Sequence, residues 1–209
     1  MPLVDVPLPE PSEAALPAAI ARLLADADRR IARFHQTHRN SPVAGYVNSD
    51  FTMSWRVIDA VVRSGLAPGP AFCEWGSGFG VVTVIAATLG LDAVGIEINA
   101  DLVEESEELA AAHDAECDFV CGNFVPTDGQ EMADGQDGFD ASGGQDAWTE
   151  LEMDPSDFDL VYVFPWPDEV SMVQSLFEAF AADDALLITC RGMDGMQLQR
   201  KVRRSRRGQ

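Results

Sequence analysis

The chain has few basic residues and a single lysine, Lys201. Against 35 aspartates and glutamates it carries 14 lysines and arginines, and its formal net charge is −21. Six of the basic residues fall in the last ten positions, which leaves 8 basic against 35 acidic residues before position 200. A body with this charge repels nucleic acid and attracts cationic substrates. Adaptation to salt explains the same composition equally well, so the charge indicates a substrate class only weakly.

Long apolar runs and a basic N-terminal stretch are also missing. No segment approaches the roughly 18 apolar residues of a membrane-spanning helix. Residues 1–11 have neither the basic start nor the apolar centre of a secretory signal, so we expect a cytoplasmic protein. The spacing of His113, Cys117 and Cys121 matches no usual zinc pattern. We expect reduced thiols and no metal for the four cysteines, which are Cys73, Cys117, Cys121 and Cys190.

The alternation of elements predicts an α/β fold with one main domain. Apolar residues at helical spacing and short apolar runs alternate along the chain, which favours a doubly wound, mostly parallel sheet. The predicted helices are 17–38, 52–64, 81–89, 100–113 and 170–182, and the predicted strands are 71–74, 93–96, 117–121, 159–164 and 185–190. The predicted organisation is an N-terminal lead and helix at 1–40, the main domain at 41–195 and a basic tail at 196–209.

A segment within the main domain has a different composition. Residues 127–157 hold ten acids, no basic residue and five glycines. This composition does not favour a core, and we predict a flexible acidic insertion, with a lid as one interpretation. Its acids lack the spacing of an EF-hand calcium loop. The basic tail is interpreted as a solvated end, with contact to RNA or an acidic partner as the alternative.

Three glycines at alternate positions separate a predicted strand from a predicted helix. Gly76, Gly78 and Gly80 follow a strand that ends near Glu74, and the next strand ends on Glu97. Glycine permits positive φ and lets a ligand lie against the backbone, while the helix N-terminus points its amides at that ligand. An acid about 20 residues further on is placed to accept ribose hydroxyls. These features predict a nucleoside cofactor; the alternative is an ordinary tight turn beside a solvated acid.

The order of acid and glycines resembles motif I of the class I S-adenosylmethionine-dependent methyltransferases. Glu74-x-Gly76-x-Gly78-x-Gly80 differs from the G-x-G-x-x-G of dinucleotide-binding proteins. A carboxylate before the glycines suits a cofactor with a cationic amino-acid end and repels a pyrophosphate. The resemblance implies a Rossmann-like methyltransferase fold, the cofactor S-adenosyl-L-methionine (SAM) and methyl transfer to a nucleophile. Residues after Arg191 supply at most one further strand, near 196–202, so the antiparallel strand pair that usually ends this fold is predicted to be short or missing.

Further cofactor contacts follow from the same resemblance. Gly122-Asn123-Phe124 resembles a G-D-A/F step, in which the polar side chain reads the adenine amino group and its neighbour packs on the ring. The loop before motif I often closes over the cofactor, which makes Tyr46, Ser49 and Asp50 candidates; a plain surface loop is the alternative. The predicted cofactor-binding residues are Glu74, Gly76, Ser77, Gly78, Gly80, Glu97, Ile98, Asn123, Phe124 and Tyr46.

A stiff aromatic loop follows the fourth predicted strand. Phe164-Pro165-Trp166-Pro167 shares proline and aromatic character with the N/D-P-P-Y/F/W sequence of nitrogen-directed methyltransferases but lacks its leading polar residue. The resemblance implies a narrow slot for an amine, held by cation–π contact; a hydrophobic turn over the core is the alternative. The candidate catalytic residues are Phe164, Trp166, Asp168 and Tyr162. Glu169 is a further candidate proton acceptor, and no residue is clearly a base.

Four short features are similar to small archaeal and mitochondrial protein-lysine methyltransferases. They are Gly45-Tyr46-Val47, the stretch from Gly95 to Asn99, Val163-Phe164 and Thr189-Cys190-Arg191. That family usually has aspartate in place of Glu74 and a different proline loop. The resemblance implies an amine acceptor such as a protein lysine. Three alternatives remain open: a small-molecule methyltransferase, a non-catalytic SAM-binding module and a dinucleotide oxidoreductase. The acidic body argues against nucleic acid.

Overall fold

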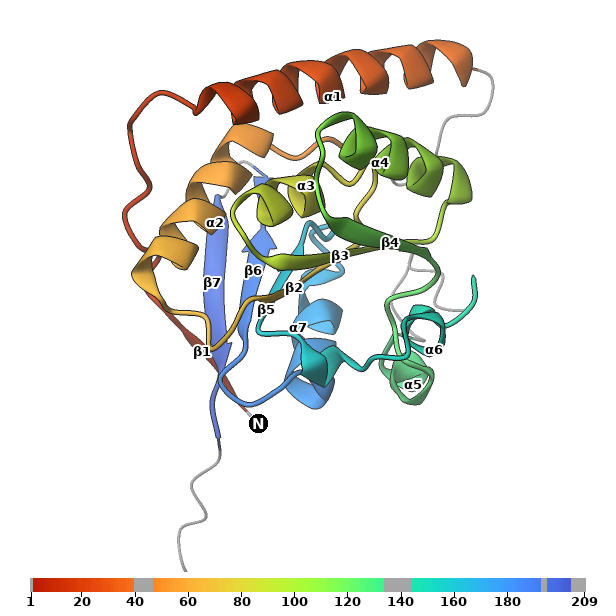
Figure 1. The fold of residues 1–209 in the computed structure, drawn as a ribbon. Coiled ribbons are helices and arrows are strands. Elements are labelled where there is room, and N and C mark those ends of the chain that lie inside the picture. Colours follow the sequence, from red (N-terminus) through yellow and green to blue (C-terminus); the bar gives the residue numbers. More distant parts are fainter. Residues whose placement is uncertain (1, 40–46, 134–143, 193–194, 204–209) are drawn as a thin grey trace, which may run out of the picture.

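The computed structural model describes residues 2–39, 47–133, 144–192 and 195–203, and a seven-stranded sheet runs through the molecule (Figure 1). The strand order is β1-β7-β6-β5-β2-β3-β4. Neighbouring strands from β6 to β4 run parallel, and only β7 runs antiparallel to its neighbours. The strands are β1 (Leu3–Asp5), β2 (Ala71–Trp75), β3 (Asp92–Glu97), β4 (Cys117–Cys121), β5 (Leu160–Val163), β6 (Leu186–Cys190) and β7 (Met196–Lys201). The predicted doubly wound, mostly parallel sheet is confirmed.

Helices cover both faces of this sheet, as Figure 1 shows. One face carries α2 (Phe51–Ser64), α3 (Val81–Thr88) and α4 (Ala100–Ala112), and α1 (Ala18–Thr37) lies outside them as a further layer. The other face carries α5 (Gln130–Ala133), α6 (Ala147–Leu151) and α7 (Val170–Phe180), with 3₁₀ turns at Thr127–Gly129 and Pro155–Asp157. A separate apolar core fills each side of the sheet. No helix in the described part of the chain is long and apolar enough to span a membrane.

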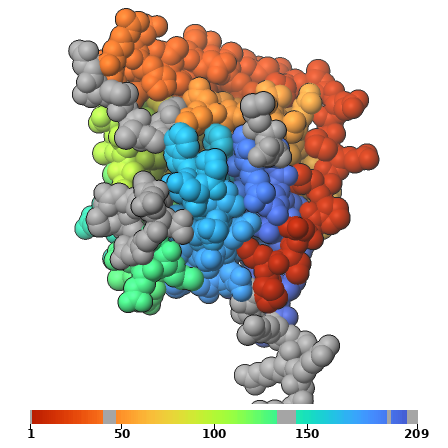
Figure 2. Space-filling view, turned by 180° about the vertical axis from the view of Figure 1, so that it is seen from behind, coloured from red at the N-terminus to blue at the C-terminus, as the bar shows by residue number. Residues whose placement is uncertain are grey.

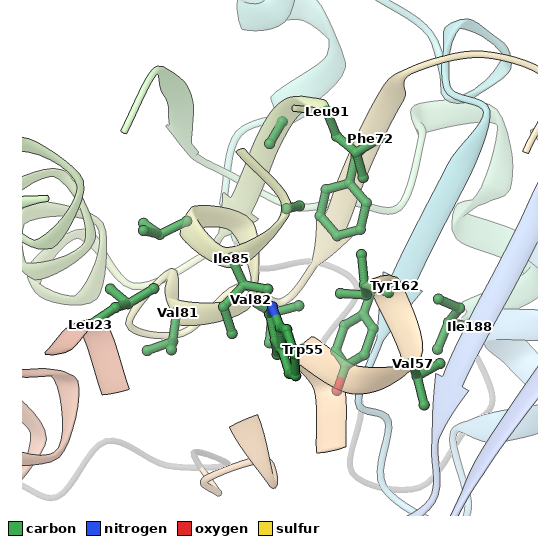
Figure 3. Packing of buried hydrophobic residues seen from close by; sticks show 14 of the residues in the cluster. Leu23, Trp55, Val57, Phe72, Val81, Val82, Ile85, Leu91, Tyr162 and Ile188 are labelled. Carbon is green, nitrogen blue, oxygen red and sulfur yellow. The ribbon is translucent and has the colours of Figure 1, made fainter. Parts of the chain in front are cut away.

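The N-terminal helix joins the core through one apolar face. Its buried residues recur at helical spacing and belong to the same cluster as α2 and α3; they are Ile20, Leu23, Ala27, Ile31 and Phe34. Figure 3 shows Leu23 of α1 beside Val81 of α3. The ring of Phe34 meets the ring of Phe79 edge-on at 5.2 Å between centroids. The helix therefore packs behind the glycine turn that contains Phe79 and supports it from outside the sheet.

One edge of the sheet joins residues near the two ends of the chain. β7 pairs with β6, with Met196 opposite Cys190, and β1 pairs with β7, with Leu3 opposite Lys201. Figures 1 and 2 show the red N-terminal segment beside the blue C-terminal one. The single C-terminal strand lies where we predicted it, but the prediction of a short or missing terminal pair is wrong, because N-terminal residues supply the second strand. A three-residue strand among prolines has no sequence pattern of its own, and its pairing alone defines it.

Parts of the acidic segment contribute to the core, contrary to the expectation from its composition. Ala133 and Ala147 are fully buried, and Trp148 is 4% exposed. The indole Nε1–H of Trp148 donates to the carbonyl oxygen of Phe124 at 2.8 Å. One buried tryptophan contributes a large apolar area to the core. The composition of the 31-residue segment as a whole, which is mostly polar, does not reveal this contribution. The middle of the segment, residues 134–143, lies outside the described residues.

Two basic residues of the predicted tail belong to the folded sheet. The guanidinium of Arg200 donates to the carbonyl oxygens of Leu66 at 2.9 Å and Asp184 at 3.1 Å. Lys201 is 2% exposed, and its ammonium donates to the carbonyl oxygens of Ala181 and Ala179 at the C-terminal end of α7. A cation at this end also interacts favourably with the helix dipole. The only lysine in the sequence therefore caps the C-terminal end of α7 and has a structural role.

We expect Lys201→Met to lower the free energy of unfolding by about 2 kcal/mol, because the helix carbonyls lose a charged donor. Urea titration measures the effect. Arg203→Met is the matched control, since Arg203 is 85% exposed and pairs only with Asp183 at the surface; there we expect a change within about 0.5 kcal/mol. Equal losses in the two variants would contradict a structural role for the buried lysine.

Candidate functional site

A cavity of about 1040 Å³ lies at the carboxyl ends of β2, β3 and β5, where the strand order reverses. Ligands bind at this switch point in doubly wound sheets. One wall comes from the turn between β2 and α3, the end of β3 and the residues after β4. The opposite wall comes from the segments after β5 and β6 and from the start of α7. Of the described candidates for the cofactor or catalysis, all line this cavity except Asp50, Gly80 and Asp168.

The glycine turn brings the backbone to the cavity. Gly76 has φ +74°, and a Cβ built on it would meet no atom within 4 Å, so its surroundings leave room for a ligand. The N–H groups of Gly76 and Ser77 both donate to the carbonyl oxygen of Ile96 at 2.9 Å. Gly80 has φ +66°, and a Cβ there would lie 2.5 Å from the ring of Phe119. Gly80 therefore permits close packing behind the turn, which explains why it does not line the cavity.

Glu74 is a buried carboxylate at the end of β2. It is 5% exposed, and its Oε2 accepts the Thr83 N–H at 2.8 Å and the Thr83 hydroxyl at 2.6 Å. Burial raises the pKa of Glu74 to about 8, while the hydrogen bonds from Thr83 favour the ionised form. The carboxyl group joins β2 to α3 and also lines the cavity. A cation bound in the cavity would favour its ionised state.

Glu97 lies at the end of β3 and holds the glycine turn. Its Oε2 accepts the Gly78 N–H and its Oε1 accepts the Asn99 N–H, each at 2.9 Å. Burial raises the pKa of this carboxyl, and the backbone donors oppose that shift. A carboxylate has about four acceptor positions, and the backbone of Ile98 also bonds to this group, so at least one position remains for a hydroxyl donor of a ligand. The ribose-binding role of Glu97 stays a prediction.

The residues after β3 and β4 form an apolar side of the same wall. Ile98 is 49% exposed at the cavity. The ring of Phe124 stacks on Trp75, with centroids 5.4 Å apart and planes 10° apart. The side-chain oxygen of Asn123 accepts the Val125 N–H at 2.9 Å. That oxygen, which we expected to accept from adenine, therefore already orders the turn that presents Phe124.

Ser77 carries an unpartnered polar atom in this wall. Its residue is 6% exposed, and its buried hydroxyl has no hydrogen-bond partner among the described residues. A Cβ built on Gly95 would lie 2.9 Å from Ser77 Oγ, so the hydroxyl packs closely against β3. Ser77 belongs to the glycine turn. Glu97 holds this turn through the Gly78 N–H, and Glu74 holds the helix that follows it through the Thr83 N–H.

The aromatic loop forms the opposite wall. Trp166 is 47% exposed, and Phe164, Pro165 and Pro167 line the cavity beside it. The Trp166 N–H donates to Glu169 Oε2 at 2.9 Å, which fixes the loop to the start of α7. Burial raises the pKa of the Glu169 carboxyl. Asp168 lies outside the cavity lining, so Glu169 is the acid that this loop presents.

Tyr162 anchors the loop before α2. Figure 3 shows its ring packed among Trp55, Val57 and Ile188, and the residue is 1% exposed. Its hydroxyl makes hydrogen bonds with the hydroxyls of Ser49 at 2.9 Å and Ser54 at 3.0 Å. Burial raises the pKa of this phenol well above its usual range, so the group stays neutral at pH 7. These contacts favour a positioning role for Tyr162 over that of a base.

The candidate cofactor contacts in the loop before α2 have different positions in the structure. Ser49 lines the cavity, whereas Asp50 caps α2 by accepting the Met53 N–H at 3.0 Å. Tyr46 lies outside the described residues. Several lining residues were not among the sequence candidates, and they include Phe51, Trp75, Gln174 and Arg191. Trp75 lies inside the motif and Arg191 directly follows a strand, and both positions were available signals. Phe51 and Gln174 lie in helices, and only the fold brings them to the cavity.

No group of three metal-ligating side chains occurs among the described residues. His113 Nε2 instead lies 3.2 Å from Asp26 Oδ2, which joins α4 to α1. The four cysteines are free thiols.

The fold matches that of known methyltransferases. An RNA methyltransferase from Salinibacter ruber, solved with S-adenosyl-L-homocysteine (SAH), is 14% identical over 78% of this chain and 98% of that chain, with a TM-score of 0.51. An O-methyltransferase from Bacillus cereus, solved with SAH, is 12% identical over 85% of this chain and 67% of that chain, with a TM-score of 0.53. The chain spans about half the length of three other methyltransferases, whose TM-scores lie below 0.5.

These identities are low, so the likeness establishes a shared fold. No protein-family model matches the sequence, and no curated protein matches it. The similarity to small protein-lysine methyltransferases stays a prediction from the sequence.

We expect the stability of the ligand-free protein to fall as pH rises from about 5 to about 8. The pKa of Glu74 is about 8 in the folded protein against an ordinary value of 4.5, so the folded state binds more protons in this window. The free energy of unfolding then decreases with pH. Glu74→Gln removes this proton and should flatten the dependence, with a smaller slope left by Glu97.

Urea titrations at several pH values measure this dependence. The matched control is Glu104→Gln, a change at an exposed position of α4 that should keep the parental slope. An unchanged slope in Glu74→Gln would show that this carboxyl does not retain its proton.

Proposed function

We propose that this protein is a SAM-dependent methyltransferase. The observation that carries the proposal is the arrangement of Glu74, the glycine turn and Glu97 on one wall of a large cavity at the switch point of the sheet. Two proteins with this fold were solved with SAH, the product form of the cofactor. The dinucleotide alternative has less support, because the glycine spacing of this turn differs from the G-x-G-x-x-G of dinucleotide-binding proteins.

The wall residues fit the parts of this cofactor. Glu97 would accept the ribose hydroxyls with the oxygen positions that Gly78 and Asn99 leave open. Ile98 and Phe124 supply apolar surface for the adenine. The Glu74 carboxyl suits the amino-acid end, where its ionised form can balance a positive charge. When bound, SAM supplies a sulfonium-activated methyl group.

An amine is the acceptor that we infer, such as the side chain of a protein lysine. Glu74, Glu97 and Glu169 all line the cavity and favour a cation. The exposed face of Trp166 offers a cation–π contact to an ammonium group. An amine with a pKa near 10.4 must lose a proton before it reacts. Glu169 is the proposed proton acceptor, since burial raises its pKa and makes it a stronger base than a surface carboxylate.

Two alternatives keep some support. A small-molecule methyltransferase fits the same cavity, and a non-catalytic module would bind SAM without transferring its methyl group. The motif contains no evident catalytic base, but this favours neither alternative. A methyl donor that is already activated needs mainly alignment with the nucleophile. The O-methyltransferase and RNA methyltransferase share this fold at 12% and 14% identity, so their acceptors are not transferred to this chain.

We expect Glu97→Gln to weaken SAH binding at least tenfold, because the amide replaces a charged acceptor of the ribose hydroxyls. Isothermal titration calorimetry with SAH, SAM and NAD measures this. Glu107→Gln, an exposed position on α4, is the control with parental affinity. Binding of NAD alone, or of no nucleotide, would refute the proposed cofactor.

We expect Trp166→Ala to lower kcat/KM for methyl transfer about tenfold, because the loss of a desolvated cation–π contact of ~1–2 kcal/mol weakens acceptor binding. SAH affinity should stay parental, and Trp166→Phe should recover part of the activity. The assay transfers radiolabelled methyl groups to lysine-rich proteins and small amines. A wild-type protein that binds SAH but methylates none of them would favour the non-catalytic module.

A further inference from the structure

Arg191 is the only cationic side chain among the described residues that line the cavity. It directly follows β6, and its N–H donates to the carbonyl oxygen of Gly195 at 2.8 Å, which holds its backbone in place. A Cβ built on the neighbouring Gly192 would lie 4.0 Å from the ring of Phe164. Arg191 therefore belongs to the wall of the aromatic loop, opposite the glycine turn.

This arginine is exposed and forms no ion pair within the described chain, although acids outnumber bases by 35 to 14. Other arginines are paired away from the cavity: Arg30 with Glu108 at 3.0 Å, Arg33 with Glu105 at 3.3 Å and Arg63 with Asp59 at 2.8 Å. Arg22 and Arg56 also lack ion pairs, but neither lines this cavity. A guanidinium is thus left available in the lining of the cavity.

The start of α7 adds a second feature that favours an anion on this wall. Val170 and Ser171 line the cavity, and the first turn of this 11-residue helix contains no acid. The side chain of Glu169 does not cap the helix. Unpaired N–H groups at a helix N-terminus carry a partial positive charge and attract anions. Arg191 and the first turn of α7 therefore act in the same direction.

Carboxylates that line the same cavity as Arg191 would repel an anionic ligand, so their positions and hydrogen-bond partners must be considered. Glu169 directs Oε2 to the Trp166 N–H. Glu74 and Glu97 lie on the cofactor wall. Asp5 lines a second cavity of about 300 Å³ that Arg191 also borders, and its carboxylate accepts from Gln197 at 2.7 Å and Gln199 at 3.1 Å. These acids all have other donors, and none forms an ion pair with Arg191.

We propose that Arg191 binds an anionic group, a carboxylate or a phosphate, carried by the methyl acceptor. The inference rests on the proposed methyltransferase function and narrows its substrate class. The acceptor then has an amine that faces Trp166 and Glu169 and an anionic group that faces Arg191. A guanidinium suits this task because its fork of donors matches both carboxylate and phosphate oxygens.

The test measures binding of matched probes to the SAH-saturated protein by calorimetry. Phenylalanine is compared with phenethylamine, and phosphoethanolamine with ethanolamine, so that each pair differs in its anionic group. We expect the wild type to bind the anionic member of one pair about tenfold more tightly, as one charge-assisted bidentate contact provides. Arg191→Gln should abolish this preference, and Arg191→Lys should keep part of it. The pair that shows the preference identifies carboxylate or phosphate.

The control variant is Arg22→Gln, which removes an exposed arginine of α1 far from the cavity lining and should keep the preference. Equal binding of both members of each pair, no binding of any probe at millimolar concentration, or a preference that persists in Arg191→Gln would overturn the inference.

Cofactor titrations separate this inference from the proposed function. Absence of SAH binding in the wild type would refute the proposed function and the inference with it. If the wild type binds SAH but shows no preference for the anionic probes, the inference about Arg191 is refuted and the proposed function is not. Arg191→Gln could also weaken SAH but not 5′-methylthioadenosine, which lacks the amino-acid end. Arg191 would then bind the carboxylate of the cofactor, and the assignment to the acceptor would be wrong.

Discussion

Two carboxylates buried at the ends of adjacent parallel strands hold the site together. Taking a carboxylate out of water costs free energy unless hydrogen bonds compensate, and here the donors come from the turn and helix that must be ordered. Glu74 receives two hydrogen bonds from Thr83, and Glu97 receives the N–H groups of Gly78 and Asn99. The glycine turn is thereby fixed on both sides, and its open backbone faces the cavity.

The two walls of the cavity are built in different ways. The wall with the glycine turn comes mainly from one continuous βαβ unit, in which Glu74 and Thr83 are 9 residues apart and Gly78 and Glu97 are 19 residues apart. The wall with the aromatic loop combines Phe51 from α2, Trp166 after β5 and Arg191 after β6. The hydroxyl of Tyr162 ties this wall to the loop before α2 through Ser49 and Ser54. The proposed cofactor contacts thus come mainly from one chain segment, whereas the proposed acceptor contacts come from segments far apart in the sequence.

The distribution of charge in the structure differs from the overall charge. The body is strongly acidic, yet the described arginines of α1 and α2 that form ion pairs do so at the surface. The only lysine is buried at the end of α7. A single unpaired guanidinium therefore stands out in the cavity. Net charge governs long-range attraction, but the groups within a few ångströms govern which ligand fits.

The sequence by itself determined the strands and helices around the glycine turn, because apolar periodicity and positive-φ glycines are local properties. It also marked Glu74 and Glu97, since an acid at the end of a parallel strand lies at the ligand-binding edge. Tertiary structure alone decided that residues 3–5 form a strand, that Trp148 brings the acidic segment into the core, and that Phe51 and Arg191 meet at one cavity. Each of these features depends on partners distant in the chain. Contacts between distant segments produce no local periodicity in the sequence, so they could not be predicted from it.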